Sequence, residues 1–305
     1  MKRVFIKRIA LVLLLVISIL FLFLCIKKQV NKPSEIPHRL QWWLEAINWD
    51  AESRENGLSG DGILIAVIDT AIDIEHPDLV GKNIEQIVVD DVNDINSFEH
   101  GTAVAGILCA YPKTNEGVLG IATNANILSI VISSNTEADI ESLIRGIEYA
   151  ISKKADIINI SAGVITEFPA LQNVINDAFD AGIIIVAASG NDLAGGSLYP
   201  AKYDNVISVG SFDFNGQPLY GSDSNSVLLP GGNIVTTYSS IYEPKKYVSF
   251  SGTSMSCAML SGVIALILEQ NPNISNVDVL NYFRYNSQER FDTLSILDDF
   301  RKMSK

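Results

Sequence analysis

Apolar runs alternate with amphipathic stretches along most of the chain. The five clearest runs cover residues 62–69, 125–133, 155–161, 182–189 and 205–211. Runs that are apolar on both faces are typical of parallel strands with helices on both sides. Between them, residues 139–151 and 168–182 carry apolar side chains at helical spacing, and residues 255–268 are almost wholly apolar, as in a buried helix. This alternation predicts a doubly wound α/β fold with a mainly parallel sheet and helices on both faces.

The N-terminal pattern differs from the rest. Residues 9–26 form a run of 18 positions without a charge, which as a helix would be about 27 Å long, enough to cross the core of a bilayer. Four basic residues precede the run and two follow it, which favours a cytoplasmic N-terminus and an extracytoplasmic remainder. We therefore expect a basic stub and transmembrane signal-anchor over residues 1–28, a linker over 29–39 and one folded domain over 40–305.

A cleaved signal peptide, followed by secretion, is the alternative interpretation of this N-terminus. Such peptides have a shorter apolar core and end in small residues. Here the run ends in "FLFLCIKK", which contains no such site, and Leu24 is larger than the residue expected before a lipoprotein cysteine at Cys25. The anchor that stays in the membrane is therefore preferred.

Composition narrows the class of protein. Hydrophobic residues make up 48% of the 305 positions and charged residues 19%, as in a folded chain. Residues 1–32 hold seven of the 22 basic side chains and none of the 35 acids, so the remainder is strongly acidic. Such a surface repels phosphate backbones, which argues against nucleic acid as a partner.

Cysteine usage indicates neither a disulfide framework nor a zinc site. The chain has three cysteines, of which Cys25 lies in the predicted anchor, while Cys109 and Cys257 lie in apolar helical stretches. We expect the last two to be buried free thiols. A bridge between them is the alternative.

Ser254, in "FSGTSMSCAML", is either a nucleophile or only the cap of the apolar helix that follows. A serine hydroxyl becomes a strong nucleophile when a base takes its proton, and histidine is the usual base. The chain has three histidines. His38 lies in the predicted linker, His76 in "HPDL" suits a structural role, and His100 stands where a loop enters a helix of small residues. His100 is therefore the candidate base.

A histidine base needs an acid that fixes its tautomer. Asp69 ends the first long apolar run, in "AVIDTAID", at the sheet edge where doubly wound folds bind ligands. A helix cap is its alternative role. Asp73 is the nearest rival, but it lies beyond the strand and suits the ordering of a turn.

With these residues in the order Asp69, His100, Ser254, the chain resembles the subtilisin-like serine proteases, or subtilases. The segments "AVIDTAIDIEHPDL", "HGTAVAGI" and "SGTSMS" resemble the aspartate, histidine and serine motifs of that family, and "GVLGIATNANI", "ADIINISAG", "VAASGN" and "YPAKYDNVISVGS" resemble further segments in the same order. The similarity spans roughly residues 40–285. It implies a serine endopeptidase that cleaves peptide or protein substrates through an acyl-enzyme.

The resemblance also assigns further residues. Asn191 matches the side-chain donor of the oxyanion hole, with the backbone N–H of Ser254 as the second donor. Residues Ser161, Ala162 and Gly163 match the strand edge that pairs with the substrate backbone. Asp192 matches a position bordering the primary specificity pocket, where an acid would favour a basic or polar side chain.

Cofactor expectations rest on the resemblance as well. No cofactor is required for this chemistry. Asp78 matches a calcium-ligand position in many relatives, but the companion loop, "CAYPKTNEGVLG", differs from theirs in length. Calcium at Asp78 is therefore left open.

The motifs depart from the family at four positions. Ala71 replaces the usual glycine, Glu99 a small residue, Ala103 a common second histidine and Ala258 the usual proline after the nucleophile. Alanine is a strong helix former, so we expect the helix to persist with looser packing behind Ser254. None of these changes removes a catalytic atom.

Two further features bear on the biological role. The similarity starts soon after the predicted anchor, so we expect no folding pro-domain. The predicted anchor would tether the enzyme to the membrane, and a tethered enzyme suits a dedicated processing (leader) peptidase for a secreted peptide. The competing class is a catalytically silent homologue that binds peptides without cutting them. The oligomeric state is not predicted.

Overall fold

The computed structural model describes residues 41–49, 57–89, 98–113, 117–133, 139–191, 197–220, 225–240, 246–286 and 291–303. The chain divides into two units, residues 1–36 and 37–305, and every described residue belongs to the second. The predicted anchor and linker lie outside the described residues and stay predictions.

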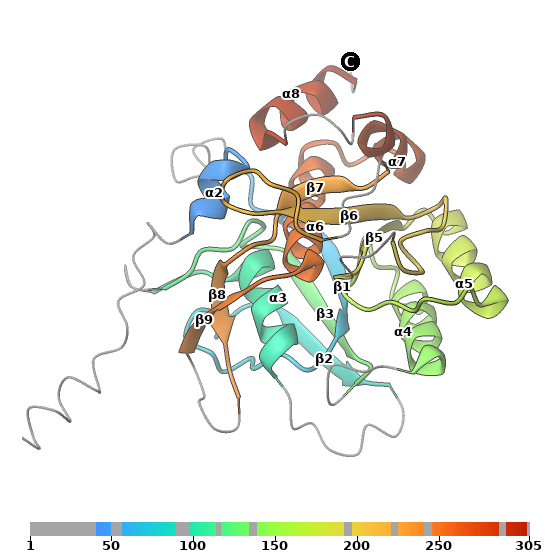
Figure 1. Ribbon diagram of the computed structural model, residues 1–305, viewed down its shortest axis with the longest axis horizontal. Helices are drawn as coiled ribbons and strands as arrows, with labels where there is room; N and C mark the ends of the chain where they lie inside the picture. The colour runs from blue at the N-terminus through green and yellow to red at the C-terminus, as the bar shows by residue number, and fades with distance from the viewer. Residues whose placement is uncertain are drawn as a thin grey trace, which may run out of the picture. The chain divides into compact units, whose positions relative to one another are not determined.

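A seven-stranded parallel sheet forms the centre of the second unit (Figure 1). Its strands, in spatial order, are β2 (Ile84–Val88), β3 (Asn126–Val131), β1 (Leu64–Asp69), β4 (Ile157–Ile160), β5 (Ile184–Ala188), β6 (Ile207–Phe212) and β7 (Val227–Pro230). Because β1 lies between β3 and β4, the chain extends the sheet first to one side of β1 and then to the other. Asp69 thus ends the strand at which the direction of winding changes, where such sheets bind ligands.

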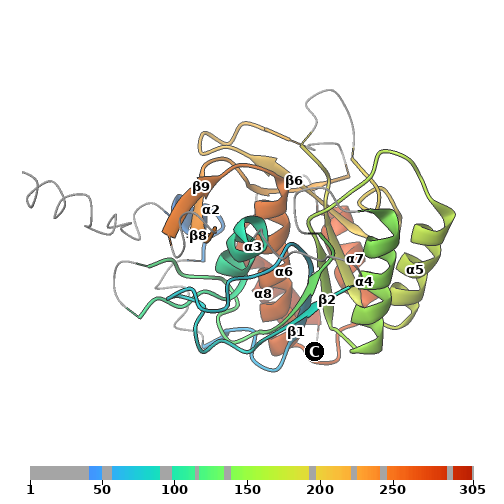
Figure 2. The same cartoon turned by 90° about the horizontal axis from the view of Figure 1, so that it is seen from below.

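Helices cover both faces of the sheet (Figure 2). Helices α3 (Glu99–Cys109) and α6 (Thr253–Gln270) pack on one face, and α4 (Ile140–Ser152) and α5 (Pro169–Asp180) on the other. Alternate residues of β1 enter the two cores, so that Val67 belongs to the α3–α6 side and Ile68 to the α4–α5 side. The predicted doubly wound fold is confirmed.

Shorter elements complete the unit. They are α2 (Trp42–Ala46), α7 (Asn276–Tyr285), α8 (Thr293–Met303) and an antiparallel hairpin of β8 (Ile234–Tyr238) and β9 (Lys246–Phe250). The β8 strand holds α3 in place, because Thr236 Oγ1 donates to the Ala103 carbonyl at 2.8 Å and Thr237 Oγ1 to the Thr102 carbonyl at 2.6 Å. Both carbonyls lie one turn or less beyond His100.

Helix α6 is the central helix of the core. Every residue from Thr253 to Ile267 is buried, which explains why its sequence lacks an amphipathic pattern. By length and composition it is the one helix among the described residues that could cross a membrane, but 83% of it is buried inside the protein, as in the core helix of a folded domain. The helix runs unbroken through Ala258, which is fully buried, so the expected persistence of this helix is confirmed.

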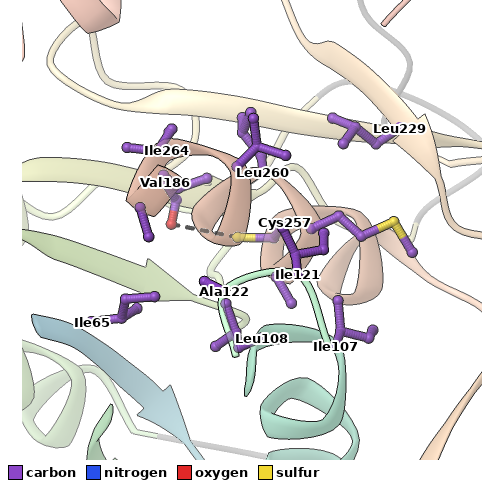
Figure 3. Packing of buried hydrophobic residues seen from close by; sticks show 14 of the residues in the cluster. Ile65, Ile107, Leu108, Ile121, Ala122, Val186, Leu229, Cys257, Leu260 and Ile264 are labelled. Carbon is purple, nitrogen blue, oxygen red and sulfur yellow. Dashed lines mark hydrogen bonds between the residues drawn. The ribbon is translucent and has the colours of Figure 1, made fainter. Parts of the chain in front are cut away.

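The two described cysteines are free and buried, as predicted. Figure 3 shows Cys257 of α6 directed at β5, where its Sγ donates to the Val186 carbonyl at 3.5 Å. Burial raises the pKa of the Cys257 thiol above its ordinary value and that of the Cys109 thiol to about 12. Both thiols therefore stay protonated near neutral pH, and neither is an activated nucleophile.

Candidate active site

Asp69 and His100 form a direct side-chain pair. The imidazole Nδ1 lies 2.8 Å from Asp69 Oδ1 and 2.9 Å from Oδ2. An ionised carboxylate can only accept hydrogen bonds, so Nδ1 carries the proton and Nε2 of the neutral ring is left as an acceptor. The Asp69 side chain is 3% exposed and that of His100 is 25% exposed. The pair thus leaves one basic nitrogen on a partly exposed ring that a buried carboxylate holds in place.

Burial and the neighbouring Asp69 have opposite effects on the basicity of His100. Burial lowers the pKa of His100, whereas the charge of Asp69 and the hydrogen bond to Asp69 raise it. The two contributions of Asp69 together prevail, so the pKa of His100 lies above its ordinary value of 6.5. Near neutral pH the ring can therefore both take and return a proton, as general acid–base chemistry requires.

Thr70 joins the strand that carries Asp69 to the helix that carries His100. Its backbone N–H donates to Asp69 Oδ1 at 2.6 Å, and its Oγ1 accepts from the Gly101 N–H at 2.9 Å. A Cβ at Gly101 would lie 2.2 Å from the Thr70 carbonyl oxygen. Only glycine therefore lets α3 begin so close to the end of β1, and this contact brings His100 to Asp69.

Ser254 is the second residue of α6 and is 8% exposed. The interpretation of Ser254 as the helix cap is wrong, because the N-cap residue is Gly252, which has no side chain to form a capping bond. Gly252 has a φ of 155° and leaves room for the Asn191 side chain, whose Nδ2 would lie 3.0 Å from a Cβ placed there. The hydroxyl of Ser254 is thus not used in capping.

Asn191 supplies the cap that Gly252 lacks. Its Oδ1 accepts from the Thr253 N–H at 2.9 Å and from Thr253 Oγ1 at 3.2 Å. Because both bonds use the carboxamide oxygen, the Nδ2 group of this exposed residue can still donate. The bonds fix Asn191 at the N-terminus of α6, where free N–H groups and the helix dipole favour negative charge.

Phe250 lies close to Ser254 along the chain and its ring contacts His100. It ends β9, four residues before Ser254, and its ring meets the His100 imidazole edge-on with centroids 6.4 Å apart. Among the hydrogen bonds of the described residues, none joins Ser254 to His100. Nucleophile–base contacts are often longer in unliganded enzymes than in their substrate complexes.

The predicted substrate edge follows directly after β4. Ser161 and Ala162 are half-buried and Gly163 is exposed, so the edge is accessible. Asn159, which was not among the predicted site residues, supports this edge through a hydrogen bond to Ser161. This fully buried residue accepts hydrogen bonds from Ser261 Oγ at 3.0 Å and Cys257 Sγ at 3.3 Å and donates through Nδ2 to Ser161 Oγ at 3.3 Å. A carboxamide inside the apolar run "ADIINIS" was the available signal.

Asp192 and calcium remain predictions. Asp192 lies outside the described residues. The nearly buried carboxylate of Asp78 accepts from the Val118 N–H at 2.9 Å, and a Cβ at Gly117 would lie 2.6 Å from both of its oxygens. The described residues contain no group of three or more potential metal-ligating side chains, and residues 114–116 of the neighbouring loop are outside them. One carboxylate that already binds the backbone does not by itself define a calcium site.

Comparisons with known proteins identify the family. The model of the subtilase family, peptidase S8, matches residues 60–294. The chain is 33% identical over 248 residues to an alkaline protease of Alkalihalobacillus alcalophilus, a match that covers 80% of this chain and 63% of that protein. The chain belongs to the subtilase family, and the segment it shares spans less than two thirds of the length of this relative.

Two solved structures resemble this chain in overall fold. The protease domain of PatA superposes with a TM-score of 0.68 at 28% identity, covering 79% of this chain and 98% of that one. The prenylagaramide maturation protease PagA superposes with a TM-score of 0.66 at 27% identity, covering 75% of this chain and 86% of that one. The match to nearly the whole of the PatA protease domain shows a subtilisin-like α/β fold.

Proposed function

We propose that this protein is a serine endopeptidase in which Ser254 is the nucleophile, His100 the general base and acid, and Asp69 the carboxylate that orients His100. The observation that carries the proposal is the hydrogen-bonded Asp69–His100 pair, which leaves Nε2 as the acceptor in a chain of the subtilase family. Membership in this family supports peptides or proteins as the substrates. The protein's own side chains and backbone N–H groups supply every catalytic role in this chemistry, so we propose that no cofactor is required.

The steps follow from the roles of these groups. The substrate backbone pairs with the edge formed by residues 161–163, and His100 Nε2 takes the proton as Ser254 Oγ attacks the carbonyl carbon. Asn191 Nδ2 and the Ser254 N–H stabilise the oxyanion of the tetrahedral intermediate. His100 then gives the proton to the leaving amine, which leaves an acyl-enzyme. Water activated by His100 releases the acyl group and restores Ser254.

A fluorophosphonate probe tests the proposal. The probe phosphonylates an activated serine, so the wild-type protein is expected to carry one label and Ser254→Ala none, because the attacking oxygen is absent. Intact-mass measurement reports the label. Ser256→Ala is a matched control, since Ser256 lies two residues further along α6 with its Oγ donating to the Pro230 carbonyl at 2.8 Å. An unlabelled, folded wild-type protein would support the silent peptide-binding homologue instead.

The narrower proposal is a processing role. Its support is the likeness to PagA, a prenylagaramide maturation protease. An enzyme of this kind cleaves a defined site in a particular precursor. Efficient digestion of many unrelated unfolded proteins would contradict the processing role and leave the endopeptidase proposal intact.

We also propose that residues 9–26 anchor the protein in the cell membrane, with the catalytic domain outside the cytoplasm. Full-length protein is expected to stay in the membrane pellet after alkaline carbonate extraction, because about 18 uncharged residues can span a bilayer. A chain lacking residues 1–28 is expected in the supernatant. Full-length preparations whose intact mass shows cleavage near residue 26 would instead support secretion after signal removal.

A further inference from the structure

Leu198 occupies the space between two glycines of the candidate site. A Cβ placed on Gly190 would lie 2.8 Å from Leu198 Cγ, and one placed on Gly163 would lie 3.0 Å from Leu198 Cβ and 3.3 Å from Cδ1. The half-buried leucine side chain therefore contacts the backbone of both glycines on the faces where their side chains would be. Either glycine, given a side chain, would collide with it.

The backbone around Leu198 is bonded to both of the segments that its side chain contacts. Its N–H donates to the Ser189 carbonyl at 2.7 Å, next to Gly190. Tyr199 and Val164, which follow Leu198 and Gly163, exchange two hydrogen bonds of 2.9 Å and 2.8 Å. With its main chain bonded on both sides, Leu198 cannot leave the space without breaking hydrogen bonds, so a change of side-chain rotamer is the smaller motion available to it.

These two glycines flank the place where a substrate would react. Gly190 precedes Asn191, the proposed oxyanion donor, and Gly163 ends the proposed substrate edge. If the substrate pairs with residues 161–163 and its attacked carbonyl lies at Asn191, as proposed above, the side chain on the Cα next to that carbonyl would lie near these two glycines. We propose that Leu198 fills this primary pocket and restricts cleavage to bonds that follow a small residue such as glycine, alanine or serine. The inference deepens the proposed endopeptidase function and rests on it.

Steric and chemical arguments support this selectivity. A larger side chain would have to displace a leucine packed between two backbones, whereas a methyl or hydroxymethyl group needs little room. Close packing makes each additional methylene costly, and enzyme pockets typically discriminate by roughly 10- to 200-fold per methylene. Leucine also offers no polar partner, so a long basic side chain would gain no hydrogen bond from it.

The test is a set of peptides that differ only at the residue before the cleaved bond. The wild-type protein is expected to cleave after alanine at least about 10-fold faster, in kcat/KM, than after phenylalanine. Leu198→Gly is expected to raise the phenylalanine-to-alanine ratio by about 10-fold or more, and Leu198→Ala by less. Leu219→Gly is the matched control, because Leu219 contacts Gly232 outside this site in the same way, with Cδ1 2.8 Å from a Cβ placed there.

Fluorophosphonate titration distinguishes a failure of the Leu198 proposal from a failure of the proposed endopeptidase function. It counts active sites, so rates are compared per labelled molecule even where a variant folds poorly. A labelled wild-type protein that cleaves equally well after phenylalanine would overturn the role of Leu198 and leave the proposed function standing. Preferred cleavage after lysine or arginine, lost in Asp192→Ala, would overturn it in favour of the pocket predicted from Asp192. Absence of any label would contradict the proposed function itself.

Discussion

Replacing His100 with alanine is expected to lower kcat by roughly 10⁶-fold, the scale of loss found when a subtilisin loses its catalytic histidine. The physical reason lies in the pair that His100 forms with Asp69, at 2.8 Å and 2.9 Å from the two carboxylate oxygens. Without the ring, no group remains to take the Ser254 proton or to protonate the leaving amine. Peptide affinity is expected to change little, because the proposed substrate edge at residues 161–163 is intact. Single-turnover kinetics with a peptide substrate measures both quantities.

The other two histidines provide controls for this variant. His38→Ala is expected to keep full activity, because His38 lies in the predicted linker. His76→Ala is expected to lower thermal stability, since His76 is fully buried, accepts from the Asp78 N–H at 3.2 Å and packs edge-on against Tyr247. Its activity per labelled active site is expected to stay near that of the wild type. A His100→Ala protein with more than a small fraction of wild-type activity would contradict the role assigned to His100.

The sheet could be predicted only where its strands are covered on both faces. Strands β1 and β3 to β6 lie in continuous apolar runs because helices bury both of their surfaces. Strand β2 lies at the sheet edge and was not predicted, because its residues are only half-buried or exposed. Strand β8 was not predicted either; its polar Thr236 and Thr237 are fully buried and bind carbonyls of α3. Such polar strands gain their burial from tertiary contacts that no local pattern shows.

The candidate site shows the same difference between residues that a local sequence pattern reveals and residues whose role depends on tertiary contacts. Residues that take part directly in the chemistry could be proposed from sequence, because the chain has only three histidines, Asp69 ends a predicted strand, and the catalytic candidates stand in motifs that resemble those of the subtilases. Several residues that support the site, among them Thr70, Asn159 and Leu198, could not. Leu198 in "SLYPAKY" looks like any leucine until the fold brings it between Gly163 and Gly190. Asn191 was identified as an oxyanion donor, but its capping of α6 through Thr253 depends on two segments 62 positions apart.

Exchanging Asp69 for asparagine is expected to reduce kcat by roughly 10⁴-fold while leaving the fold in place. Asparagine is nearly isosteric, but its amide can donate to Nδ1, which moves the imidazole proton to Nε2 and prevents that nitrogen from accepting the Ser254 proton. Asp73→Asn is the matched control. Asp73 accepts from Ser239 Oγ at 2.7 Å and from the Glu75 N–H at 3.0 Å, so it orders a turn, and its loss is expected to change kcat by only a few-fold.

The pH profile of the Asp69→Asn variant gives a second, independent readout. The proposed base works when His100 is neutral, so kcat/KM of the wild type should rise with pH through a midpoint above 6.5, because Asp69 raises the pKa of His100. Without that carboxylate, burial alone acts on the ring and favours its neutral form. The acid limb of the residual activity is therefore expected to shift to lower pH. An unchanged midpoint would mean that another group controls the profile, whereas a lower midpoint together with the lower kcat would assign to Asp69 both the tautomer and the basicity of His100.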